Sequence, residues 1–116
     1  MSTSKIRRLL LQAGVDPALS GYDYLLTAIE IGLNDRTLLQ CVTSKIYPII
    51  GEKYNVKPKN AERCMRIAVD NMKSTHSPWF QKEVVGLMEN KKVLSNSQFI
   101  AICVEILKIQ EEENAQ

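Results

Sequence analysis

The sequence predicts an all-α fold: a single compact domain over residues 1–116, with about six to seven helices that include a helix-turn-helix. Three observations predict it. Apolar residues recur at spacings of three and four, no segment alternates as a strand would, and five Gly and four Pro leave little room for long loops. A length of 116 residues with 45% hydrophobic and 24% charged residues suits one soluble domain.

Residues that favour helix starts and helix ends predict the bounds of the helices in the first two thirds of the chain. These helices are expected over residues 4–13, 20–33, 35–47, 48–54 and 58–74. Gly14 ends the first helix, because glycine readily adopts the left-handed conformation after a last turn. Pro48 has no N–H to donate to the preceding turn, so we expect a break or kink near Tyr47. Pro58 stands at the first position of the last of these helices, where proline is favoured.

The sequence of the final third of the chain predicts two further helices and a C-terminal tail. Ser77-Pro78 is expected to start a helix that ends near Met88, and residues 89–94 read as a polar loop. Ser95 or Asn96 caps a last helix over residues 97–110. Its broad apolar stripe is expected to join the core, with a partner-binding surface as the alternative. Residues 111–116 are expected to form a frayed acidic tail.

Several classes of protein are excluded by composition. No run approaches the roughly 18 apolar residues of a membrane span, and no signal-peptide core is present, so a cytoplasmic location is expected. Cys41, Cys64 and Cys103 form no CxxC pair and, with the single His76, cannot complete a zinc site. They are expected to be buried, reduced thiols, and no metal or cofactor is expected. Without paired carboxylates or a phosphate-binding glycine loop, no enzyme is predicted.

Positive charge is concentrated in the middle of the chain. Residues 42–74 contain seven basic and three acidic residues, a net charge of +4, whereas the whole chain carries +2. A basic segment of this kind is typical of a nucleic-acid-binding surface. Taken alone, the same charge pattern also fits a solvated helix face.

Residues 48–74 fit the steric pattern of a helix-turn-helix. Gly51 supplies a small residue where the first helix would cross the second, and Asn55 tolerates the positive φ of the turn. Val56 is the apolar residue that would plug the core. The side chains expected to face the first helix are Ala61, Cys64, Met65, Ala68 and Met72.

The opposite face of the helix over 58–74 carries the candidate DNA contacts. Arginine can donate two hydrogen bonds to guanine, Glu62 can accept one from cytosine, and Asn60 can bind adenine or a phosphate. Lys57 and Lys59 are suited to phosphates. The alternative for Glu62 is an i,i+4 ion pair with Arg66. The predicted DNA-binding residues are Lys57, Lys59, Asn60, Glu62, Arg63, Arg66 and Lys73.

Four sequence blocks stand out along the chain: Gly21-Tyr22-Asp23-Tyr24-Leu25, Tyr47-Pro48, Glu62-Arg63-x-x-Arg66 and Asn96-Ser97-Gln98-Phe99-Ile100-Ala101. In this order they resemble the C-terminal DNA-binding effector domain of the stage-zero sporulation protein A family of sporulation response regulators. The resemblance implies an all-α domain that binds DNA boxes related to TGTCGAA, in tandem or as a dimer. It also implies contact with an RNA polymerase sigma factor, and DNA-contacting positions at Glu62, Arg63 and Arg66.

The sequence departs from the family in three places. Asn60 stands where the family usually has an arginine that helps to read the box, and residues 74–93 diverge. The printed sequence also contains no receiver domain, which leaves open a constitutive regulator, an antagonist or a fragment. The alternative function is therefore a protein-interaction module that binds sigma factor, RNA polymerase or a full-length homologue, with weak or no specific DNA binding.

Overall fold

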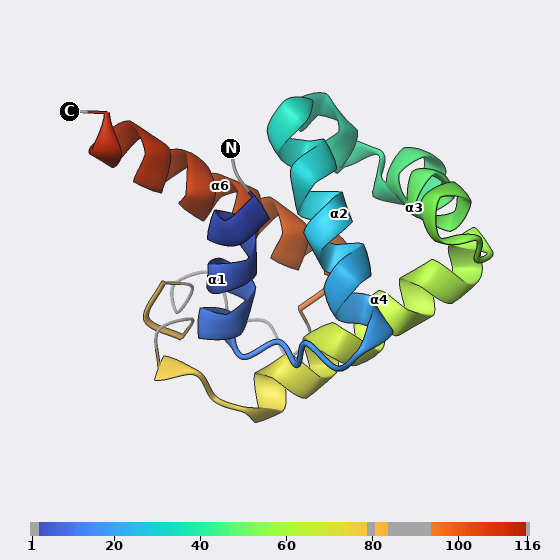
Figure 1. Ribbon diagram of the computed structural model, residues 1–116, viewed down its shortest axis with the longest axis horizontal. Helices are drawn as coiled ribbons and strands as arrows, with labels where there is room; N and C mark the ends of the chain where they lie inside the picture. The colour runs from blue at the N-terminus through green and yellow to red at the C-terminus, as the bar shows by residue number, and fades with distance from the viewer. Residues whose placement is uncertain (1–2, 79–80, 84–93, 116) are drawn as a thin grey trace.

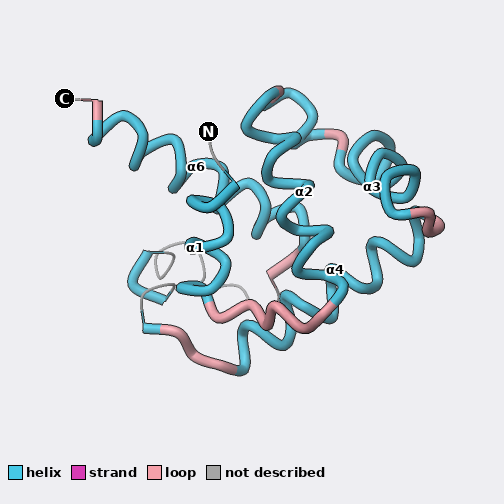
Figure 2. Tube along the Cα trace, in the orientation of Figure 1, coloured by secondary structure: helices cyan, strands magenta, loops and turns pink. Residues whose placement is uncertain are grey.

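The central helix of the molecule is α2 (Ser20–Asn34), which packs against α1 (Thr3–Ala13), α4 (Pro58–Ser74) and α6 (Asn96–Asn114) (Figure 1). The computed structural model describes residues 3–78, 81–83 and 94–115. Helices account for the regular structure of these residues, and none of them forms a strand (Figure 2). The predicted all-α fold is therefore confirmed.

Local signals begin and end several helices as predicted. Gly14 adopts a φ of +95° directly after α1, and the N–H of Val15 donates to the carbonyl of Leu10 at 2.9 Å. Asp16 forms the next turn by accepting from the N–H of Ala18 at 2.9 Å. Pro58 occupies the first turn of α4. Each of these features depends on a few neighbouring residues, which is why the sequence alone placed them.

The segment between α2 and α3 (Tyr47–Tyr54) differs from the expected single helix with a break near Tyr47. Asp35 caps a short 3-10 helix, η1 (Arg36–Gln40), and the backbone breaks at Cys41, where φ is −129° and ψ is 40°. A π-helical turn, η2 (Val42–Ile46), then runs into α3 with Tyr47 in helical conformation. The wider turn lets the chain remain helical while it passes Pro48, which has no N–H.

The last helix is longer than predicted. Ser95 and Gln98 form a capping box at its start, and the helix continues to Asn114, so the expectation of a frayed tail from residue 111 is wrong. The physical reason is composition: residues 105–113 contain no Gly or Pro and include four Glu with one each of Leu, Lys and Gln, all of which favour helix. Residues 78 and 81–83 are helical. The rest of the helix predicted to Met88, and the loop over 89–93, lie outside the described residues.

The core lies where α2 meets its neighbours. Its largest fully buried side chains are Phe99, Ile6, Leu9, Leu10, Leu25, Ile29, Ile46, Ile50, Met65, Met72, Ile100 and Leu107. Gly21 marks the closest approach of α2 to α4: a Cβ there would lie 2.8 Å from the Cβ of Ala68 and would overlap the carbonyl oxygen of Cys64. None of the described helices is both long enough and apolar enough to cross a membrane.

Candidate nucleic-acid interface

A tight turn joins α3 to α4. Asn55 adopts the left-handed conformation (φ 56°, ψ 48°), as predicted, and the carbonyl of Gly51 accepts from the N–H groups of Asn55 and Val56. Val56 is half-buried against the core. A Cβ at Gly51 would lie 2.5 Å from the carbonyl oxygen of Val56. The next nearest atoms are N and Cδ of Pro58, the first residue of α4, at 3.3 and 3.4 Å. Gly51 is therefore needed where the turn brings the start of the second helix against the first.

The inner face of α4 is sealed against the rest of the molecule. Ala61, Met65 and Ala68 are completely buried, and Val69 and Met72 continue the same face. Cys64 is only half-buried, which corrects the prediction of a fully buried thiol, and Cys41 is half-buried as well. Cys103 on α6 is buried, and burial raises the pKa of its thiol far above the ordinary value of 9.0.

The outer face of α4 and the turn before it hold most of the predicted DNA contacts. Exposed residues on this surface include Lys57, Lys59, Asn60, Arg63 and Arg66. Glu62 is half-buried. Ile67 exposes 47% of its surface on the outer side of α4 and was not among the predicted contacts. The sequence does contain an indication of this exposed residue, because Ile67 is apolar but does not fall at the helical spacing of the buried residues of α4.

Lys73 lies apart from the other predicted contacts. It is half-buried at the C-terminal end of α4, with its Nζ 3.9 Å from the carboxylate of Asp70. At 1.5 Å per residue, Lys73 is about 21 Å along the helix from Lys59. At a rise of about 3.4 Å per base pair this separation corresponds to about six base pairs, so the two lysines cannot contact the same base pair.

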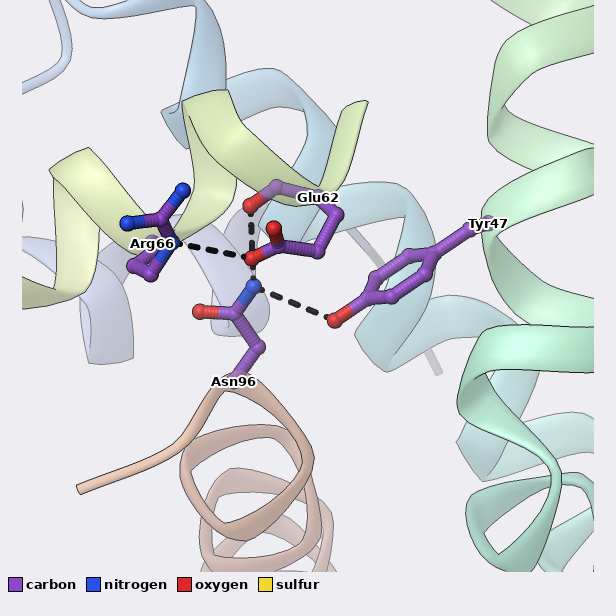
Figure 3. A network of polar contacts seen from close by, with 4 residues as sticks. All are labelled: Tyr47, Glu62, Arg66 and Asn96. Carbon is purple, nitrogen blue, oxygen red and sulfur yellow. Dashed lines mark hydrogen bonds and ion pairs between the residues drawn. The ribbon is translucent and has the colours of Figure 1, made fainter. Parts of the chain in front are cut away.

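Glu62 and Arg66 are joined on the outer face of α4 (Figure 3). The Nε of Arg66 donates to Oε2 of Glu62 at 3.1 Å, which is the i,i+4 pair considered from the sequence. The Arg66 side chain stays 58% exposed and that of Glu62 34% exposed. This contact uses the single hydrogen on Nε, so the two terminal nitrogens of the guanidinium keep their donors for another partner.

Asn96 ties this pair to the rest of the helix-turn-helix (Figure 3). It is 6% exposed, and its Nδ2 donates to the hydroxyl of Tyr47 at 3.1 Å and to the carbonyl oxygen of Glu62 at 3.0 Å. Burial raises the pKa of the Tyr47 phenol, opposed by the hydrogen bond from Asn96, so Tyr47 is a neutral acceptor here at pH 7. Tyr47 and Asn96 both stand in the sequence blocks that predicted the family, but nothing in those blocks indicates that their side chains are in contact.

A small cavity of about 250 Å³ lies beside this network. Its lining residues are Tyr47, Glu62, Arg66, Asp70, Leu94, Ser95, Asn96 and Ser97. Among the described residues, no group of three or more His, Cys, Asp or Glu side chains is placed to hold a metal ion. The outer face of α4 presents a row of exposed hydrogen-bond donors, and the buried contacts of its inner face hold the helix in place. This arrangement suits binding to a polyanion such as DNA.

Comparison with known families identifies this arrangement. The family model described as "Sporulation initiation factor Spo0A C terminal" matches residues 6–107. The match begins in α1, ends in α6 and includes all of α3 and α4. It confirms the resemblance drawn from the four sequence blocks, three of which meet in the network of Tyr47, Glu62 and Asn96. The chain therefore belongs to the family of Spo0A C-terminal domains, which are DNA-binding effector domains of sporulation regulators.

Proposed function

We propose that this protein is a sequence-specific transcription regulator that places the N-terminal half of α4 in the major groove of a DNA box related to TGTCGAA. One observation carries the proposal. The same helix buries Ala61, Met65 and Ala68 on its inner face and exposes Arg63 and Arg66 on its outer face, after a left-handed turn at Asn55. Recognition helices read base edges with their N-terminal residues in this geometry.

The exposed side chains divide into two roles. Arg63 and Arg66 are the donors for guanine, since each guanidinium can form two parallel hydrogen bonds to O6 and N7. Glu62 carries the acceptor for the amino group of cytosine, and Asn60 can contact adenine in place of the family's arginine. Lys57 and Lys59, before and at the start of α4, are suited to phosphates, which orient the helix without reading sequence.

Selection of bound duplexes from a random DNA pool tests the proposal most directly. We expect an enriched box related to TGTCGAA, with the position read by Asn60 the least constrained. A fluorescent duplex carrying the selected box is then titrated beside a scrambled duplex at one salt concentration. Specific binding at least about 10³-fold tighter than to the scrambled duplex is expected. Equal affinity for the two duplexes would reject sequence-specific recognition.

The proposal includes a protein partner and a mode of assembly. The resemblance to the family supports contact with an RNA polymerase sigma factor and tandem or dimeric occupancy of DNA, and each is tested separately. A duplex with two boxes should bind a second molecule with an affinity that depends on the spacing between the boxes. A stable complex with sigma factor, together with no shift of any DNA at low salt, would instead favour the protein-interaction module.

A further inference from the structure

We infer that Asn96 is a positioning residue for DNA recognition, which sets how α4 presents Glu62 and Arg66 to the bases. The inference rests on the proposed function, since it names a determinant of specificity for the same interface. Asn96 itself does not reach the outer face, because it is 6% exposed and its amide is directed at two protein oxygens.

The amide nitrogen of Asn96 connects three helices. From α6 it donates one hydrogen to the Tyr47 hydroxyl on α3 and the other to the Glu62 carbonyl on α4, so both of its hydrogens are used between the two helices of the helix-turn-helix. The capping box fixes the start of α6, with Ser95 and Gln98 joined by bonds of 3.1 and 3.2 Å. Asn96 is therefore a point fixed by α6 from which the other two helices are aligned.

Directional bonds are needed here because the remaining contacts of α4 are largely apolar. Its inner face packs through Ala61, Met65 and Ala68. These apolar contacts determine which face of the helix is buried, but because they are not directional they tolerate small rotations about the helix axis. The hydrogen bond from Asn96 to the Glu62 carbonyl restricts these small rotations. Because the Glu62 carboxylate holds Arg66 at 3.1 Å, a rotation of α4 moves both charged groups relative to a bound base pair.

Asn96→Leu tests the role, since leucine has a similar size and no donor. The preference of the protein for the TGTCGAA-like duplex over a scrambled duplex is expected to fall about tenfold, while affinity for the scrambled duplex and its salt dependence stay unchanged. Tyr47→Phe removes one of the two acceptors of the Asn96 amide, so it should lower the preference less than Asn96→Leu does. This milder variant keeps the test valid if Asn96→Leu does not fold. In an Arg66→Ala background, Asn96→Leu should change the preference less than about twofold.

Ile6→Val is the matched control, because it loosens the buried face of α1 and Ile6 takes no part in the hydrogen bonds of the network. A loss of preference in this control as large as in Asn96→Leu would overturn the inference in favour of a general loss of stability. An unchanged preference in both Asn96→Leu and Tyr47→Phe would overturn it as well. If the wild-type protein itself shows no preference, the proposed function fails and the inference falls with it. The wild-type measurement therefore separates the two failures.

Discussion

The two faces of α4 differ in almost every physical respect although they share one backbone. On the inner face, Met65 and Ala68 are completely buried and α2 approaches so closely that only Gly21 fits opposite. On the outer face, Arg63 and Arg66 extend into solvent, and the one partner described for Arg66 is Glu62 on the same helix. The inner face thus determines where the helix lies, and the outer face determines what it can contact.

This difference predicts that stability and DNA binding can be changed separately. A substitution on the inner face alters packing, so it should lower the free energy of unfolding and DNA affinity together. A substitution on the outer face removes an exposed side chain, so it should lower DNA affinity and leave unfolding within about 0.5 kcal/mol. Four substitutions test how sharp the separation is.

Gly21→Ala should have the largest effect. Its Cβ would overlap the carbonyl oxygen of Cys64, a backbone atom that cannot move without moving α4. We expect a loss of about 3 kcal/mol in the free energy of unfolding, measured by urea denaturation, with DNA binding lost at temperatures where the variant unfolds.

Gly32→Ala on the same helix is the control for Gly21→Ala. The Cβ there would meet the ends of the Leu39 and Val104 side chains, at 2.7 and 3.0 Å. These side chains can shift, and alanine favours helix by about 1 kcal/mol over glycine, so a change within about 1 kcal/mol is expected. Equal destabilisation by the two substitutions would show that the close approach of α2 to α4 has no special role.

Arg66→Ala should have the next largest effect, on binding alone. Loss of a bidentate contact is expected to weaken binding to the cognate duplex by about 1–3 kcal/mol and to relax specificity at that base pair. Fluorescence anisotropy with cognate and scrambled duplexes measures both quantities. Arg36→Ala removes an arginine from another exposed ion pair, with Glu105 at 2.9 Å, and should leave the affinity unchanged. A matching loss in Arg36→Ala would indicate an effect of net charge and not of base reading.

Asn55→Ala should destabilise the protein by about 1 kcal/mol, since alanine tolerates the left-handed conformation less well than asparagine. Asn55→Gly, measured in the same urea titration, should be neutral or stabilising because glycine adopts this conformation without strain. If alanine and glycine behave alike at this position, the left-handed turn is not the feature that restrains α4.

Lys57→Ala should have the smallest effect, and an equal one on every duplex. Removal of one phosphate contact is expected to reduce the slope of log K against log salt by about 0.9 and to leave the ratio of specific to scrambled affinity unchanged. Titrations at several salt concentrations measure the slope. Lys5→Ala, on the exposed side of α1, should leave the slope as it is in the wild-type protein. A changed affinity ratio in Lys57→Ala would mean that this lysine reads sequence.

Sequence reasoning succeeded where a structure depends on near neighbours. It placed the ends of α4, the turn at Asn55 and the left-handed glycine after α1, because each follows from the stereochemistry of one or two residues. It was less accurate where alternatives are close in energy. The break at Cys41 and the π turn before Pro48 both exchange one hydrogen-bonding pattern for another at little local cost.

The candidate site divides in the same way. The polar stripe on α4 could be read from residue spacing, since spacing determines which side chains share a helix face. That spacing could not reveal that Asn96 donates to Tyr47 and to the Glu62 carbonyl. Those contacts join residues 34 and 49 positions apart, and no local rule connects such distant positions.

By itself, the sequence determined the helical class of this protein, the helix-turn-helix and the side chains of its outer face, because local stereochemistry and periodicity encode them. Only the tertiary structure decided how α4 is held: Gly21 against Cys64 on one side, and Asn96 between Tyr47 and Glu62 on the other. The reason is that the orientation of a helix is a property of its contacts with distant parts of the chain, and these exist only once the chain has folded.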